Sequence, residues 1–335
     1  MDISVAPSSS PNPWLRTLLH SDATRRLLAF AALIILIIFF SLRSEAFLQY
    51  NNVVGILLAT SVNGILALGV TFVIITGGID LSIGTVMAFS AVMSAVFLTE
   101  WNVPLGLGVL GGIGTGAVAG LINGIIISRM RVPPFIAPLG MMYVAKGLAL
   151  IFSDLRPIYF YEAPQFREIA MGSVVGRFIP EYDIPNAVLI LFGAAIVAGI
   201  LLSRTVFGRY TFALGSNEEA TRLSGVNVKT WKTAVYMICG AFAGLGGVVM
   251  AARLNSAQPA LGQGYELDAI AAVVIGGTSL SGGEGSIMGT IIGAFVMSVL
   301  TNGLRIMSVP QEWQIVVTGA ILVLAVYLDI IRRRA

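Results

Sequence analysis

A few polar side chains interrupt the apolar segments of this sequence, and their chemistry is hydrogen bonding rather than catalysis. The one cysteine, Cys239, lies in an apolar run, and the one histidine, His20, lies in a polar tail. We therefore expect no metal cluster and no nucleophile–base pair. Carboxyl, amide and hydroxyl groups within apolar segments are costly unless they pair or line a polar route. Six of them are predicted to line a path for a polar solute: Asn63, Asp80, Ser82, Asn123, Asp268 and Asn302.

Each of these groups also has a structural interpretation. Asp80 and Asp268 are placed to cap the start of a helix, with the carboxylate accepting from free backbone N–H groups. The asparagines are placed to hydrogen-bond between helices, and Cys239 suits a small core residue. Capping and path lining are compatible at Asp80, because a glycine-broken helix start in a membrane is tolerated where it faces protein or water.

The composition predicts that lipid, rather than water, surrounds most of the chain. Of the 335 residues, 56% are hydrophobic and only 11% are charged, whereas a soluble domain carries about 25% charged residues. The net charge of +3 does not indicate nucleic-acid binding, because the basic residues are spread over short connections. The elements that position the polar groups must therefore be membrane helices.

Ten segments are apolar and long enough to be candidate spans. If the N-terminus is inside, most lysines and arginines fall on inner connections, as expected of cytoplasmic loops. The sequence thus predicts an all-α integral membrane protein with both termini cytoplasmic, a tail at 1–25 and a single transmembrane domain at 26–335. The predicted spans are 27–42, 53–76, 81–98, 104–128, 135–152, 186–203, 233–251, 267–280, 287–307 and 313–331.

The chain also contains a weak internal repeat. "VNGILALG" (62–69) parallels "ICGAFAGL" (238–245), and "LINGIIISRM" (121–130) parallels "LTNGLRIM" (300–307). The same alignment pairs Asp80 with Asp268. Spans 2–5 and 7–10 would then form two halves displaced by five helices, so the halves run in opposite directions through the membrane. Inverted repeats of this kind are typical of transporters.

A polar connection at 204–232 stands out on the inner side. It contains "GSNEEATRLSGVNV" (215–228), in which Ser216 and Glu219 are spaced as a capping box and Gly225 is placed to end a short helix. A helix of two turns does not persist alone in water. We therefore expect the helix at 217–224 to lie on a surface.

The segment "LSGGE" (280–284) looks like an ATPase signature, but it lies between two spans. No glycine in the chain is followed by lysine, so a phosphate-binding P-loop is absent. We interpret the segment as a glycine-rich inner turn. Any ATP chemistry must then come from another chain, and this chain is not expected to be an enzyme.

Three stretches carry a family resemblance that covers roughly residues 50 to 330. "EATRLSG" (219–225) is similar to the glutamate-alanine-alanine, three residues, glycine motif of ABC importer permeases, with Thr221 in place of the second alanine. "GGIDLSIGTVMAF" (77–89) and "GYELDAIAAVVIGGTSLSGGEGSIMGTIIGA" (264–294) resemble the ribose-type sugar permeases.

The resemblance implies a permease subunit of the bacterial inner membrane that imports a monosaccharide. It implies three partners, namely a cytoplasmic ATPase that holds ATP and magnesium, a periplasmic sugar-binding protein, and a second permease subunit. This chain itself would hold no cofactor. The short helix would be the coupling helix that docks on the ATPase. Its expected coupling residues are Ser216, Glu218, Glu219, Ala220, Arg222, Leu223 and Gly225.

Outer arginines are available to acidic groups on the binding protein, namely Arg156, Arg167, Arg177 and Arg253. Alternatives remain at this point. The related branched-chain amino acid permeases are the nearest, but a zwitterionic substrate would want opposite charges or helix ends on the path. A secondary transporter would need titratable residues deep in the spans. The particular sugar, the gating residues and the choice between homodimer and heterodimer are not readable from the sequence.

Overall fold

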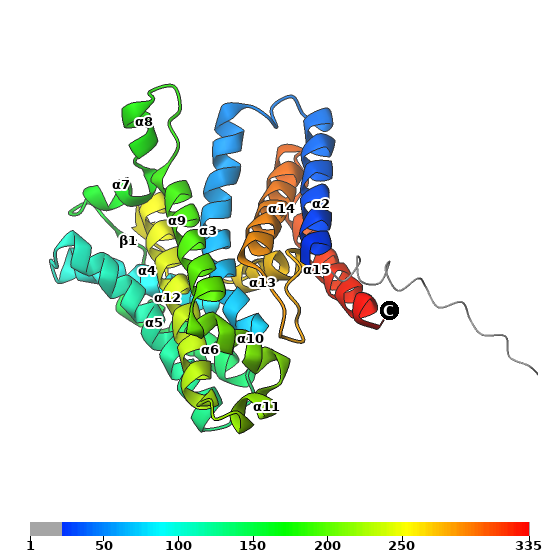
Figure 1. Ribbon diagram of the computed structural model, residues 1–335. Helices are drawn as coiled ribbons and strands as arrows, with labels where there is room; N and C mark the ends of the chain where they lie inside the picture. The colour runs from blue at the N-terminus through cyan, green and yellow to red at the C-terminus, as the bar shows by residue number, and fades with distance from the viewer. Residues whose placement is uncertain (1–21, 335) are drawn as a thin grey trace, which may run out of the picture.

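The computed structural model describes residues 22–334 and is built almost entirely of helices (Figure 1). Most of the predicted tail at 1–25 lies outside the described residues. Within them, six helices are long and apolar enough to cross a membrane: α3 (Tyr50–Ile75), α4 with its π-helical extension η1 (Ile83–Glu100), α5 (Leu105–Arg129), α9 (Asn186–Arg204), α12 (Val228–Leu254) and α14 (Ile287–Ile306).

The other predicted spans are also helical. They are α2 (Asp22–Arg43), α6 (Ile136–Phe152), α13 (Tyr265–Ile275) and α15 (Gln311–Arg334). The prediction for 267–280 was wrong at its end, because α13 stops at Ile275. Gly276 and Gly277 follow, and Gly277 has a φ of +88°, which a helix does not allow. With eleven residues, α13 is a half-length helix.

The long connection after α6 folds against the bundle. Its strand β1 (Ile158–Tyr159) pairs antiparallel with β2 (Ser256–Ala257), in the register Ile158 to Ala257. Two short helices follow, α7 (Gln165–Met171) and α8 (Val174–Phe178). The strand pair ties this connection to the segment that joins α12 to α13, and Figure 1 places α8 at the opposite end of the molecule from α11 (Glu218–Leu223).

Helices α3, α4 and α12 form the centre of the bundle and are mostly buried, whereas only 28% of the span residues of α5 and of α9 are buried. Helix α12 packs on α5 without side chains between the backbones. A Cβ on Gly116 would lie 2.2 Å from the Gly240 carbonyl oxygen, and one on Gly120 would lie 2.1 Å from the Tyr236 carbonyl oxygen. Small residues at intervals of four allow this approach of membrane helices.

The pairing of helices follows the order of the sequence repeat. Helix α12 packs on α5, and its counterpart α3 packs on α14. Likewise α4 contacts α5 and α6, and its counterpart α13 contacts α14 and α15. The aligned glycines agree only in part. Gly240 faces α5, whereas a Cβ on Gly64 would meet Leu191 of α9 at 2.7 Å before Ala294 of α14 at 3.7 Å.

The glycine contact predicts a position-specific loss of stability. Gly120→Ala must separate α5 from α12, and such overpacking costs about 1–3 kcal/mol. Gly114→Ala is a matched control on the same helix, because no described atom lies within 4 Å of its Cβ position. We expect the melting temperature of the detergent-solubilised protein to fall for Gly120→Ala alone. Equal melting of the two variants would contradict the close contact.

Candidate coupling helix and buried polar cluster

The short helix α11 begins at a different cap from the one predicted. Ser216 is the last residue of α10 (Val206–Ser216), so it cannot take the extended backbone of an N-cap. Asn217 does so, with φ −160° and ψ 100°, and its Oδ1 accepts from the Ala220 N–H at 2.9 Å. The predicted capping box of Ser216 with Glu219 was therefore wrong.

The predicted end of α11 is confirmed. Gly225 has a φ of +84°, and its N–H donates to the Arg222 carbonyl at 3.0 Å. A left-handed residue after the last helical turn is the usual role of glycine at a helix end. The helix is therefore short because both of its ends are specified by sequence.

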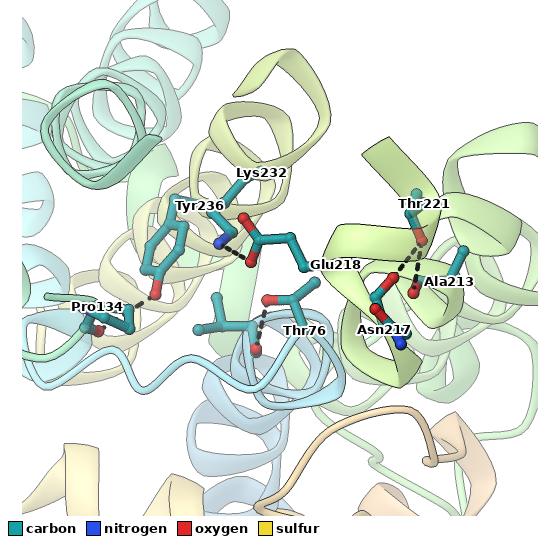
Figure 2. Close-up of polar contacts among 9 residues, drawn as sticks. Thr76, Pro134, Ala213, Asn217, Glu218, Thr221, Lys232 and Tyr236 are labelled. Carbon is teal, nitrogen blue, oxygen red and sulfur yellow. Dashed lines mark hydrogen bonds and ion pairs between the residues drawn. The ribbon is translucent and has the colours of Figure 1, made fainter. Parts of the chain in front are cut away.

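Two side chains fasten α11 to the rest of the protein (Figure 2). Thr221 is buried, and its Oγ1 lies 2.9 Å from the Ala213 carbonyl oxygen of α10. Glu218 pairs with Lys232 of α12, with 2.6 Å between Oε2 and Nζ. Glu218 was predicted as a contact for the ATPase, but its carboxylate is turned toward α12.

The remaining predicted coupling residues lie on the open side of α11. Ala220 is exposed, and Leu223 is an apolar side chain with 78% of its surface exposed. Glu219 and Arg222 form an exposed ion pair of 2.5 Å on the same helix. Leu223 is therefore a single exposed apolar side chain on an otherwise polar short helix.

The base of α11 is joined to the centre of the bundle. The glycine-rich turn at 280–284, as predicted, lies between α13 and α14, and the Gly283 N–H donates to the Ile75 carbonyl at 2.8 Å. A Cβ on Gly215, near the end of α10, would lie 1.7 Å from the same Ile75 oxygen. The ends of α3 and α10 therefore meet the turn in direct backbone contact.

Three of the six predicted path residues form one buried group. Asp80 is 2% exposed, and its Oδ1 accepts from the Ser82 N–H at 2.9 Å and from the Ser82 hydroxyl at 2.6 Å. The Asn123 amide donates to the Ser82 hydroxyl at 3.1 Å, while Asn123 Oδ1 is buried without a partner among the described residues. Helices α4 and α5 thus bring a carboxylate, a hydroxyl and an amide together.

Asp80 does not cap α4 in the predicted way. Helix α4 begins at Ile83, two residues later than expected, and Ser82 occupies the cap position. The carboxylate folds back on the residue two positions ahead, as aspartates do in turns. The glycines before it, including Gly77 with a φ of +75°, hold the chain in this turn.

Two residues of this neighbourhood were missed as functional candidates. The buried Cys239 thiol lies beside the Asp80 carboxylate, so Cys239 is more than a core filler. Tyr236, one turn earlier, is 1% exposed and donates to the Pro134 carbonyl at 3.3 Å. The internal repeat could have identified Cys239 as a candidate, because it aligns this residue with the polar Asn63.

The other predicted path residues lie elsewhere. Asn302 of α14 exchanges amide hydrogen bonds with Asn52 of α3, at 2.9 and 3.1 Å, which is the interhelical interpretation. Asn63 Oδ1 is buried without a partner among the described residues. Asp268 lies in the first turn of α13 rather than at its cap, which is Gly264. The prediction that Asp268 caps its helix was wrong.

Glu266 holds the start of α13 and was also missed. It is 8% exposed, and both of its carboxylate oxygens lie 3.1 Å from the Gly264 nitrogen. A Cβ on Gly84 of α4 would lie 2.6 Å from Glu266 Oε2 and 2.1 Å from the Gly262 carbonyl oxygen. The first turns of α4 and α13 therefore touch each other inside the bundle.

The four outer arginines divide into two kinds. Arg167 and Arg177 are exposed, and Arg156 forms an exposed pair with Asp154. Arg253 is only partly exposed, and it donates from Nη1 to the Leu58 carbonyl of α3 at 3.2 Å. Its predicted availability to a binding protein is therefore wrong, because the guanidinium joins two helices.

Comparison with known proteins decides the family. The family model described as "Branched-chain amino acid transport system / permease component" matches residues 52–326. The chain belongs to this permease family. The ribose import permease protein RbsC of Escherichia coli K12 is 42% identical over 302 residues, which cover 89% of this chain and 91% of that protein. No solved structure matches the chain.

Other relatives of this permease carry related names. RbsC of Bacillus subtilis is 41% identical over 313 residues, covering 93% of this chain and 95% of that protein. The D-allose transport system permease protein AlsC of Escherichia coli K12 is 36% identical over 300 residues, covering 90% of each chain. The permease is an all-α protein of the inner membrane, and it is a transport component.

The revised cap generates a prediction for α11. Asn217→Ala removes the side-chain acceptor and should cost about 1 kcal/mol of helix stability. Amide exchange over 218–223 should then become about fivefold faster. Ser216→Ala, the matched control, should leave exchange unchanged because Ser216 closes α10. Hydrogen–deuterium exchange with mass spectrometry measures both variants. Faster exchange in Ser216→Ala than in Asn217→Ala would contradict the Asn217 cap and support the capping box of Ser216 with Glu219.

Proposed function

We propose that this permease is the membrane subunit of an ATP-driven importer and that its substrate is a monosaccharide, ribose or a similar pentose or polyol. The observation that carries the proposal is the identity of 40% or more with ribose import permeases over nearly the whole chain. ATP and magnesium belong to a separate ATPase chain, because this sequence has no P-loop.

The buried cluster supports a sugar over an amino acid. Ser82 and Asn123 offer the hydroxyl and amide groups that suit a polyol, and Asp80 is an acceptor. A zwitterionic amino acid would favour a cation on the path as well. The description of the family model names branched-chain amino acid transport, but the relatives of highest identity shown here carry sugar names.

The proposed topology has ten spans in two inverted halves, 2–5 and 7–10, with both termini cytoplasmic. The matching contacts of α3 with α14 and of α12 with α5 support the repeat. The positions of α8 and α11 at opposite ends of the molecule support opposite sides of the membrane (Figure 1). The connection at 204–232 is then cytoplasmic, and the connection at 153–185 is periplasmic.

The proposed importer has three partners, which the permease family implies. The open face of α11, with Ala220, Arg222 and Leu223, is the docking surface for the ATPase. The exposed Arg156, Arg167 and Arg177 are available to the acidic rim of a periplasmic sugar-binding protein. A second permease subunit, identical or related, completes the assembly.

The test of the proposed function is reconstitution. The permease, its ATPase and its binding protein in proteoliposomes should accumulate a labelled monosaccharide only when ATP is supplied. The substrate screen compares pentoses, hexoses, polyols and branched-chain amino acids. Uptake of leucine without uptake of any sugar would overturn the proposal.

The docking surface predicts an effect of one substitution. Leu223→Asp should leave the permease inserted but prevent co-purification of the ATPase, because an interface anchor carries about 2 kcal/mol or more. Leu155→Asp is the control, since Leu155 is comparably exposed at 74% but lies on the opposite connection. If the Leu223→Asp complex stays intact and transports, the docking assignment fails.

The topology predicts the sidedness of labelling. Single cysteines at Ser173 and Thr230 should react with an impermeant maleimide from outside and from inside, respectively. The background is Cys239→Ser, because serine is close to cysteine in size and keeps a polar group beside Asp80. Labelling of both positions from one side would contradict the proposed spans.

A further inference from the structure

The ion pair between Glu218 and Lys232 differs from the other ion pair of α11. Lys232 exposes only 16% of its side chain, whereas Arg222 exposes 62% in its pair with Glu219. Solvent and salt screen an exposed pair far more than a partly buried one. The Glu218–Lys232 contact is therefore the stronger tie, and it joins the first turn of α11 to the first turns of α12.

Lys232 lies on the same face of α12 as two residues deeper in the bundle. Tyr236 follows four residues later and Cys239 three residues after that, so the three side chains form a stripe along one face. Figure 2 shows Lys232 turned to Glu218 and Tyr236 turned to Pro134. We name Lys232, Tyr236 and Cys239 the α12 stripe.

Tyr236 connects the stripe to two chain breaks. Its hydroxyl donates to the Pro134 carbonyl in the connection between α5 and α6. The same hydroxyl would be 2.4 Å from a Cβ on Gly78, in the connection between α3 and α4. The Tyr236 side chain is 1% exposed, so its ring cannot move without moving these neighbours.

Cys239 continues the stripe to the buried cluster. Its thiol is fully buried and lies beside Asp80, which accepts from Ser82. Asp80 and Ser82 lie where α3 ends and α4 begins. Helix α12 therefore joins the Glu218 ion pair at one end of the stripe to the break that holds the cluster at the other.

We propose that the α12 stripe couples the position of α11 to the opening of the α3–α4 break. Lys232 and Tyr236 are then positioning residues. A displacement of α11 by the ATPase pulls Lys232 through Glu218, α12 carries the displacement to Tyr236 and Cys239, and the turn at Gly78–Asp80 follows. This inference rests on the proposed function and adds the route by which the ATPase acts on the path.

The test is the number of ATP molecules hydrolysed per sugar imported, in proteoliposomes with the ATPase and the binding protein. Lys232→Met and Tyr236→Phe should retain binding-protein-stimulated hydrolysis but raise this ratio about tenfold, because they cut the linkage and not the docking surface. Lys229→Met is the matched control, an exposed lysine on the same turn of α12.

Charge reversal tests whether the ion pair itself carries the effect. The double variant Glu218→Lys with Lys232→Glu rebuilds the ion pair and should return the ratio toward that of the wild type. A proportional fall of hydrolysis and uptake in Lys232→Met, with an unchanged ratio, would mean that the pair only holds α11 in place and would overturn the proposal, as would a raised ratio that the double variant does not lower.

Two further outcomes complete the test. If Lys232→Met does not assemble with the ATPase, Tyr236→Phe is the deciding variant, because it removes one hydroxyl and keeps the ring. An unchanged ratio of ATP hydrolysed to sugar imported in Tyr236→Phe would overturn the coupling role of the α12 stripe. Failure of the proposed function is distinct, since the wild-type assembly itself would then import no monosaccharide.

Discussion

The architecture depends on backbone contact between α12 and its neighbours. Gly240 and Gly244 of α12 pack directly on Gly116 and Gly120 of α5, where a single added Cβ would meet a backbone atom at 2.1 to 2.8 Å. Lipid supplies no hydrophobic drive between helices, so close packing and interhelical hydrogen bonds must hold them together. This constraint puts α12 at the centre of the bundle, where it contacts α3, α4 and α5.

A central α12 decides where the polar groups lie. The half-length α13 and the delayed start of α4 leave two helix starts inside the bundle, and these meet at Gly84 and Gly262. Buried carboxylates occupy both starts, Asp80 at one and Glu266 at the other, and each accepts from a nearby backbone N–H. Broken helices are tolerated at this depth because protein, and not lipid, surrounds the freed backbone groups.

Helix α11 shows how a short helix is made rigid without a core of its own. Its caps come from Asn217 and Gly225, and its inner side is fixed by Thr221 and by the ion pair of Glu218. Each tie engages a different helix, α10 or α12. The open side is left with an exposed leucine, so one segment, 217–225, contains both the ties and the exposed face.

The sequence determined the class of the protein, because composition and segment length report directly on lipid as the solvent. Each predicted span within the described residues contains a helix, although the one at 267–280 ends early, and the two repeated halves make matching helix contacts. Gly225 could be recognised as the end of α11 from the sequence, because the ability to adopt a positive φ is a local property of glycine. Features of this kind can be predicted from the sequence because they do not depend on tertiary contacts.

Only the tertiary structure decided which polar group meets which. Ser216 looked like a cap, but α10 extends through it and packs at Gly215 against Ile75 of α3. Arg253 lay in a predicted loop, yet it bonds to α3, 195 residues away in sequence. Cys239 and Asp80 are also far apart along the chain. Such pairs depend on how helices are packed, and a hydrogen bond between distant residues leaves no periodicity for a single sequence to reveal.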